Sequence, residues 1–209
     1  MSKTLKSRIL SHLQENISLY IFSIALFLTG IIFGAIIVNS LPASAKTNLL
    51  TYLNTFFNEM GKGNLVDPSS LFNESFTHGF QYLGFIWLLG LSIIGLPLIF
   101  VLLFLKGIVV GFTVGFLVNQ MGWHGFWMAL ASVFPQNLVL VPAFIIVSTA
   151  AVSFSLKMIR QLLMKNRKTP LFPQFGRYGL LMVGMIGVIV VSSLFEAYIS
   201  PVLMKGIIQ

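Results

Sequence analysis

The residues best able to do chemistry in this chain are the few ionisable side chains that fall inside or beside its apolar runs. Glu196 lies toward the end of the last run, while His78, Lys106 and His124 lie near the ends of others. Burying a charge in a membrane is costly, so an ionisable residue in a membrane-spanning segment is a functional candidate by default. Near a membrane surface the same residues only anchor a helix. Both interpretations stay open; Glu196 is the candidate buried acid, and Lys106 is expected at an inner turn.

The second polar feature is the tripeptide Pro135-Gln136-Asn137, which separates two apolar runs and is followed by Pro142. Amide side chains at such a break can bond to backbone groups that the break frees. Alternatively, they line a path for a substrate. The sequence leaves these two interpretations open.

No enzyme signature accompanies these residues. The chain has no P-loop, no G-x-S-x-G elbow and no acids paired at general acid–base spacing. It contains no cysteine, which excludes thiol chemistry, disulfides and cysteine-ligated metals. The sequence therefore predicts a protein that is not an enzyme, with no cofactor and no metal site.

The composition predicts an all-α, polytopic membrane protein forming a single integral membrane domain over residues 1–209. Hydrophobic residues make up 56% of the chain and charged residues 9%, whereas soluble proteins are about 25% charged. Apolar runs of spanning length cover residues 17–41, 80–105, 138–156 and 178–199. Residues 80–105 are expected to form one helix that is kinked near Pro97.

Two further runs, residues 107–118 and 123–134, are shorter than the roughly 20 residues that a spanning helix needs. We expect them to form a short or broken central helix pair around which the other spans wrap, giving about five transmembrane helices. Gly107, Gly111 and Gly115 share one helix face, where a neighbouring backbone can approach closely. This face is a candidate for helix packing, for partner binding or for a homodimer. Gly30 and Gly34 form a similar pair, although chance spacing explains two glycines nearly as well.

The longest polar stretch, residues 42–79, is predicted to carry an amphipathic helix. Its apolar side chains recur at helical spacing and include Leu53, Phe56 and Phe57. Such a helix lies in the membrane interface, caps the bundle or binds a partner. Asp67 followed by Pro68 indicates the start of the next helix.

The net charge of +8 is concentrated in residues 1–17 and 157–177. Short basic segments stay cytoplasmic, so we expect both there, with residues 42–79 and the C-terminus outside. Nucleic acid is not an expected partner, whereas anionic membrane lipids are. Residues 43–45 form an A-x-A pattern like a signal-peptide cleavage site, but the preceding run of about 25 residues is too long for one. We therefore expect this apolar run to be retained, without cleavage, as the first transmembrane helix.

Together these features resemble the stage II sporulation protein M family, nearly end to end. The residues that carry the resemblance are Phe33-Gly34-Ala35, the Lys106-Gly107-x-x-x-Gly111-Phe112 stretch and residues 134–142, FPQNLVLVP. The resemblance implies a mother-cell membrane protein needed for engulfment of the forespore. It would be a non-enzymatic scaffold that holds two wall-degrading partners, the stage II sporulation proteins P and D, at the septal membrane.

The chain departs from the wider family at one place. At the place of residues 135–142 the family often has Pro-His-Gly, two residues, Glu, a hydrophobic residue and Pro. In this chain Gln136, Asn137 and Leu140 replace the His, the Gly and the Glu. Losing that His and Glu fits a non-catalytic role. The alternative function is a transporter or permease component with its substrate path at the broken central helices, and an intramembrane enzyme is a weaker third.

Overall fold

The computed structural model describes residue 14 and residues 16–61, 67–163 and 171–208. Within these residues the chain forms helices joined by short turns, and no strand occurs. The all-α prediction is confirmed. The elements are α2 (Ile17–Ser40), α3 (Ala43–Gly61), α4 (Pro68–Gly90), α5 (Gly95–Ser132), α6 (Phe134–Leu163), α7 (Leu171–Leu194), a π-helix η1 (Phe195–Ile199) and α8 (Ser200–Ile208).

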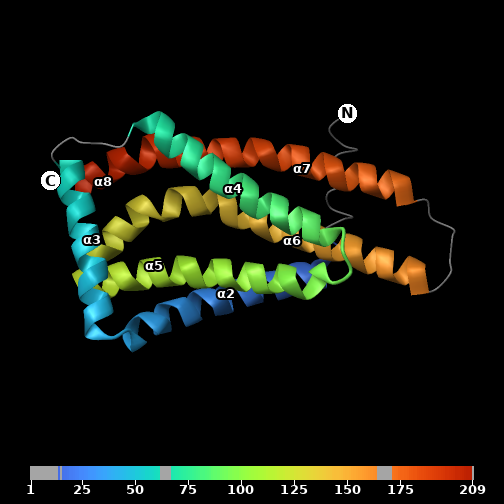
Figure 1. The fold of residues 1–209 in the computed structure, drawn as a ribbon, viewed down its shortest axis with the longest axis horizontal. Coiled ribbons are helices and arrows are strands. Elements are labelled where there is room, and N and C mark those ends of the chain that lie inside the picture. Colours follow the sequence, from blue (N-terminus) through green and yellow to red (C-terminus); the bar gives the residue numbers. More distant parts are fainter. Residues whose placement is uncertain (1–13, 15, 62–66, 164–170, 209) are drawn as a thin grey trace.

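The long helices run side by side along the molecule, and α3 lies across one end of them (Figure 1). By length and apolar character, four described segments can cross a membrane: Ile17–Ser40, Gly95–Ser132, Phe134–Gln161 and Tyr178–Met204. Helix α4 is less apolar, yet it runs along the same bundle and packs on α6 and α7. The described chain is thus a helical membrane protein with α4 as a fifth, more polar member of its bundle.

The bundle has two distinct ends (Figure 1). We call one the basic end; it carries the start of α2, the turn at residues 91–94 and the end of α6 with Lys157 and Arg160. We call the other the α3 end; it carries α3, the reversal at Gly122 and α8. The expected grouping of the first span's start with the basic segment 157–177 fits this arrangement for Lys157 and Arg160, which the structure describes.

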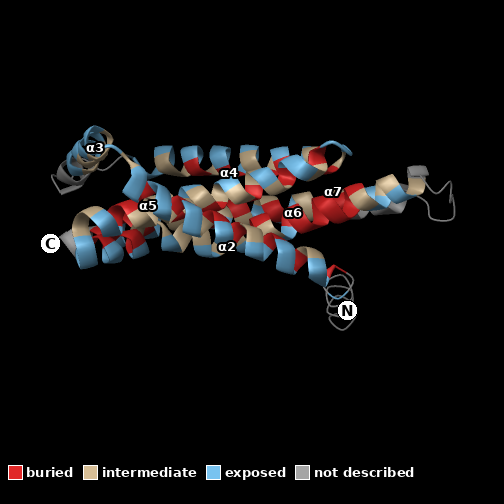
Figure 2. Ribbon diagram, turned by 90° about the horizontal axis from the view of Figure 1, so that it is seen from below, coloured by how far each residue is buried: buried red, intermediate tan, exposed pale blue. Residues whose placement is uncertain are grey.

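Helix α6 forms the centre of the bundle, with α2, α4, α5 and α7 packed around it. In its most apolar stretch 67% of the residues are buried, against 22–28% for the other three spanning segments. Figure 2 shows this burial along α6. The outward faces of the other three spanning segments are mostly apolar, as the surface of a membrane-embedded bundle must be, whereas α4 also exposes polar side chains such as Glu74, His78 and Gln81.

The prediction of one helix over residues 80–105 is wrong. Helix α4 ends at Gly90, the chain reverses over residues 91–94, and α5 begins at Gly95. Backbone hydrogen bonds close this turn, including Gly95 N to Ser92 O at 3.2 Å. A Cβ at Gly90 would lie 2.7 Å from the Ala151 Cβ, so a side chain there would block the packing of α4 on α6. Pro97 falls in the first turn of α5, where proline starts a helix without kinking it.

The short helix expected over residues 107–118 is also corrected, because this run is the middle of a helix that starts at Gly95. The break lies later, at Gly122, whose backbone adopts φ 56° and ψ −133°. Glycine adopts such a positive φ without the steric cost that other residues meet. Residues 123–132 then return as a short helical segment that leads into α6 at Val133.

Candidate functional site

The predicted glycine face packs against α2 of the same chain. A Cβ at Gly107 would lie 3.2 Å from the Gly30 Cα, and one at Gly111 would lie 2.7 Å from the Ile31 carbonyl carbon. At Gly115 the nearest atom would be the Cα of Ala35, at 3.0 Å. We call this contact the glycine seam. Because α2 covers it, the face is not free for a partner or a second copy.

Gln136 and Glu196 are brought together although they are 60 residues apart in the sequence. The Gln136 Nε2 donates a hydrogen bond to Oε2 of Glu196. The Ser192 hydroxyl, one turn before Glu196, donates to the Gln136 carbonyl oxygen at 3.2 Å. The start of α6 is therefore tied to the π-helix η1, an element type often found at functional sites.

Asn137 hydrogen-bonds to a backbone group at the helix break, as the first of the two interpretations of this tripeptide expects. Its Nδ2 donates to the Val133 carbonyl oxygen at 2.7 Å, at the junction between α5 and α6. Its Oδ1 is buried without a hydrogen-bond partner. Pro135 lies in the first turn of α6, and Pro142 lies inside that helix. Gln136 thus joins a polar contact between helices, while Asn137 supports the local backbone.

Lys106 does not lie at a turn, which corrects the sequence-based expectation. It sits in the middle of the spanning part of α5, and its ammonium lies 5.1 Å from the Phe144 ring centre and 5.7 Å from that of Tyr82. Two aromatic faces can hold a cation in a medium of low dielectric constant. The Tyr82 hydroxyl in turn donates to the Leu102 carbonyl oxygen of α5. Lys106 is the functional candidate that the sequence analysis placed wrongly.

Glu196 is the acid that interacts electrostatically with Lys106. Among the described residues the Lys106 ammonium contacts the two aromatic rings and forms no ion pair, so its attraction to Glu196 acts through space. We call Lys106, Tyr82, Gln136 and Glu196 the polar centre. It combines one positive and one negative group with an amide and a hydroxyl, contributed by α4, α5, α6 and η1.

A closely packed apolar layer lies beside the polar centre, on the side of the basic end. Leu83, Ile99, Leu103 and Phe144 are at most 1% exposed. A buried apolar layer of this kind excludes water, because it offers no hydrogen-bond partner. The centre can therefore hold charge within the membrane. Beyond this layer, toward the basic end, the core again contains buried hydroxyl groups, and that of Thr149 donates to the Ser23 Oγ at 3.4 Å.

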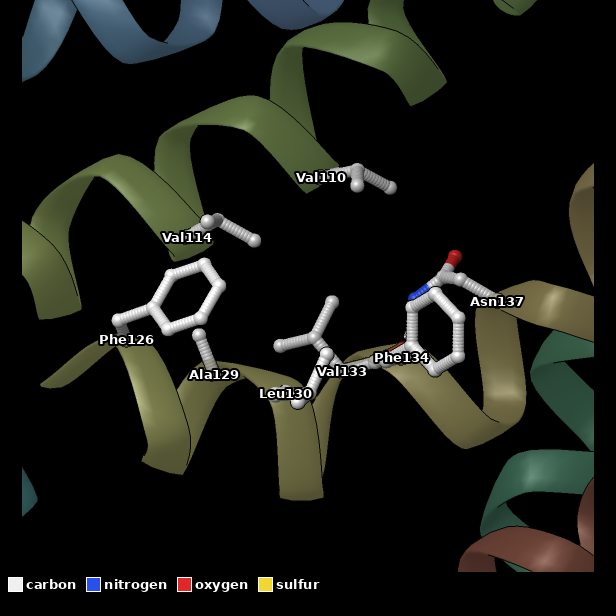
Figure 3. Close-up of a pocket in the computed structure, with 8 residues that line it drawn as sticks. All are labelled: Val110, Val114, Phe126, Ala129, Leu130, Val133, Phe134 and Asn137. Atoms are coloured by element: carbon white, nitrogen blue, oxygen red, sulfur yellow. Dashed lines mark hydrogen bonds between the residues drawn. The ribbon is translucent and has the colours of Figure 1, made fainter.

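A side pocket lies between α5 and the segment that returns after Gly122 (Figure 3). Its volume is about 220 Å³. All its lining residues are apolar except one amide: Val110, Val114, Phe126, Ala129, Leu130, Val133, Phe134 and Asn137. It is a site for an apolar group rather than for a polar substrate.

Helix α3 supplies the expected amphipathic element. Leu53 is half-buried, whereas Tyr52 is 76% exposed. The side chains of Phe56 and Phe57 lie outside the described residues, so the structure does not place them. The main contact of α3 with the bundle is with α8. Most of α3 thus lies across the α3 end without being packed into the core.

His78, in the middle of α4, and His124, just after the reversal at Gly122, lie at the surface. His78 and His124 are both exposed, and Glu74 is exposed one turn before His78 on α4. That pair of possible ligands was overlooked in the sequence. Among the described residues no group of three or more His, Cys, Asp or Glu residues is placed to bind a metal ion.

Comparison with known protein families assigns the chain. The model of the family described as stage II sporulation protein M matches residues 23–201. The chain belongs to the stage II sporulation protein M family. No curated protein and no solved structure gives a match. The family match runs from α2 to α8 and so includes the glycine seam, the side pocket and the polar centre.

The departure from the wider family pattern lies at the start of α6. Gln136 belongs to the polar centre, Asn137 lines the side pocket, and Leu140 is buried in the core at 3% exposure. At position 136, where the resemblance implies histidine in many relatives, this chain therefore has a glutamine whose amide is hydrogen-bonded to the Glu196 carboxylate.

Proposed function

We propose that this chain is a membrane scaffold that holds extracytoplasmic peptidoglycan hydrolases at the septal membrane during engulfment. Family membership makes it a sporulation-related membrane protein. The proposed partners are the stage II sporulation proteins P and D. The observation that carries the proposal is α3, an amphipathic helix placed across one end of the bundle with an exposed aromatic side chain, Tyr52.

The charge distribution supports placing α3 outside the cytoplasm. Lys157 and Arg160 lie at the basic end, together with the start of α2, and short basic segments stay cytoplasmic. The α3 end then faces the space that contains the cell wall. In this orientation a wall hydrolase reaches α3 without crossing the membrane.

A photo-crosslinking amino acid placed at Tyr52 tests the proposal in membranes of sporulating cells. We expect crosslinks to a wall hydrolase from position 52, and none from Val109, which faces outward from the middle of α5 and is 57% exposed. Tyr52→Glu should reduce hydrolase recovery. The matched control is Asn54→Glu, which adds the same charge on the other side of α3. Equal hydrolase recovery with both variants would argue against a binding role for α3.

A second candidate is transport, and the polar centre is the observation that favours it. Charged residues at membrane depth often mark the path of an ion or substrate. The apolar layer around Leu103 and Phe144 would then have to open during the transport cycle. Ion or solute flux into proteoliposomes that is lost with Glu196→Gln would support transport; flux that is absent, or equal in both proteins, would oppose it.

A further inference from the structure

The side pocket opens sideways, toward the surroundings of the bundle. Phe126, Leu130 and Phe134 line it and remain 36–51% exposed. Val110 and Val114 form the opposite wall, one turn apart on α5 (Figure 3). Because both walls belong to membrane-spanning segments, the mouth of the pocket faces the hydrocarbon layer.

The pocket occupies one half of the membrane's depth. Phe126 follows the reversal at Gly122 at the α3 end, whereas Val110 lies near the middle of α5. The pocket therefore extends from the region near one membrane surface toward the bilayer centre. This range matches the acyl chains of a single leaflet.

Aromatic side chains mark the surface end of the pocket. Trp123 and Trp127 are 79% and 53% exposed, and each contacts the Phe126 ring with centroids 5.8 Å apart. Exposed tryptophans are typical of the level of lipid headgroups. The Asn119 Nδ2 donates to Asn39 Oδ1 at 3.1 Å near the same level. A lipid with its headgroup here would place one chain beside Phe126.

We propose that the side pocket binds one acyl chain of a phospholipid from the leaflet at the α3 end. The apolar walls exclude a polar ligand, and the volume accommodates a stretch of several methylene groups. The chain enters below Trp123 and Trp127, and its end reaches Val110 and Asn137. Such a bound lipid fills the gap between α5 and the segment that leads into α6.

The test uses the full chain in phosphatidylcholine vesicles that contain a phosphatidylcholine with a diazirine at the end of one acyl chain. After illumination, mass spectrometry locates the labelled residues. Bulk lipid would label the outward-facing Val109 more strongly than its half-buried neighbour Val110. A chain held in the pocket reverses this order, and we expect several-fold more label at Val110.

Two variants that each introduce a phenyl ring sharpen the test. Ala129→Phe fills the pocket and should remove the label at Val110, whereas Val109→Phe adds its ring outside and should leave that label unchanged. Thermal unfolding checks that Ala129→Phe folds, and the Val110-to-Val109 ratio in the unchanged chain is independent of it. Stronger label at Val109 overturns the proposal. Label at Val110 that persists undiminished in Ala129→Phe also overturns it, because the label would then come from outside the pocket.

Discussion

The glycine seam and the polar centre join the same helix, α5, to its neighbours by opposite means. At the seam Gly107 and Gly111 bring the backbones of α5 and α2 into contact. At the polar centre Lys106 of α5 lies against two aromatic rings and is attracted electrostatically to Glu196 of η1. Lipid competes well for ordinary apolar packing, so helices in membranes associate through close backbone contact or through polar groups. This bundle uses both, on two neighbouring faces of α5.

The two regions should also differ in how they fail. Any added atom at the seam meets backbone, which cannot move away by changing a rotamer. At the centre, side chains can rearrange, and the damage arises from a charge left without its counterpart. The comparison therefore predicts a graded series of losses in stability.

The largest loss is expected from Gly111→Ala, whose Cβ would overlap the Ile31 carbonyl group. Overpacking against backbone should lower the free energy of unfolding by about 3 kcal/mol, and Gly111→Leu should prevent folding. Unfolding by denaturing detergent in mixed micelles measures this effect. Gly115→Ala should cost less, since its Cβ would lie 3.0 Å from the Ala35 Cα. Equal losses at both positions would contradict the backbone contact.

Lys106→Met should lower the free energy of unfolding by about 2 kcal/mol, because it leaves Glu196 without its counter-charge. Breaking a buried, contacting pair costs about 3–5 kcal/mol; here both side chains are only half-buried and not in direct contact. Lys106→Met combined with Glu196→Gln should recover part of the loss. A double-mutant cycle measures this coupling, and strictly additive losses would show that the two charges act independently.

Gln136→Leu removes the amide that donates to Glu196 and keeps a similar side-chain size. A loss of about 1.5 kcal/mol is expected, near the lower bound for hydrogen bonds to charged groups. The same unfolding titration measures it. In the Glu196→Gln background the substitution should have a smaller effect, and an undiminished effect would place the role of Gln136 elsewhere.

Gly187→Ala is the control at the small end of the series. Nothing lies within 4 Å of the position of its added Cβ on α7, unlike the glycines of the seam. Replacing an open helical glycine by alanine should raise the free energy of unfolding by about 0.5 kcal/mol. A loss comparable to that of Gly111→Ala would mean that α7 packs on something through this face.

The sequence placed several features of the site correctly but could not connect them. Glu196 and Gln136 were each singled out, one as a candidate acid and the other as part of a polar break, yet 60 residues separate them. Their contact requires α7 to return beside the start of α6, which no local pattern encodes. Lys106 was misplaced because the apolar run over residues 80–105 continues through the reversal at residues 91–94. Hydropathy does not distinguish a turn from a helix when both are apolar.

By itself, the sequence determined that this chain is a helical membrane protein of the stage II sporulation protein M family. Composition and the length of the apolar runs indicate that the chain spans a membrane, and helical periodicity predicts the amphipathic α3 and the glycine face. The tertiary structure alone decided that α2 covers that face, that Lys106 lies at mid-depth, and that Glu196 meets Gln136. The physical reason is the sequence distance over which each feature is determined. Hydropathy and helical periodicity depend on residues a few positions apart, whereas these contacts depend on which helices pack together.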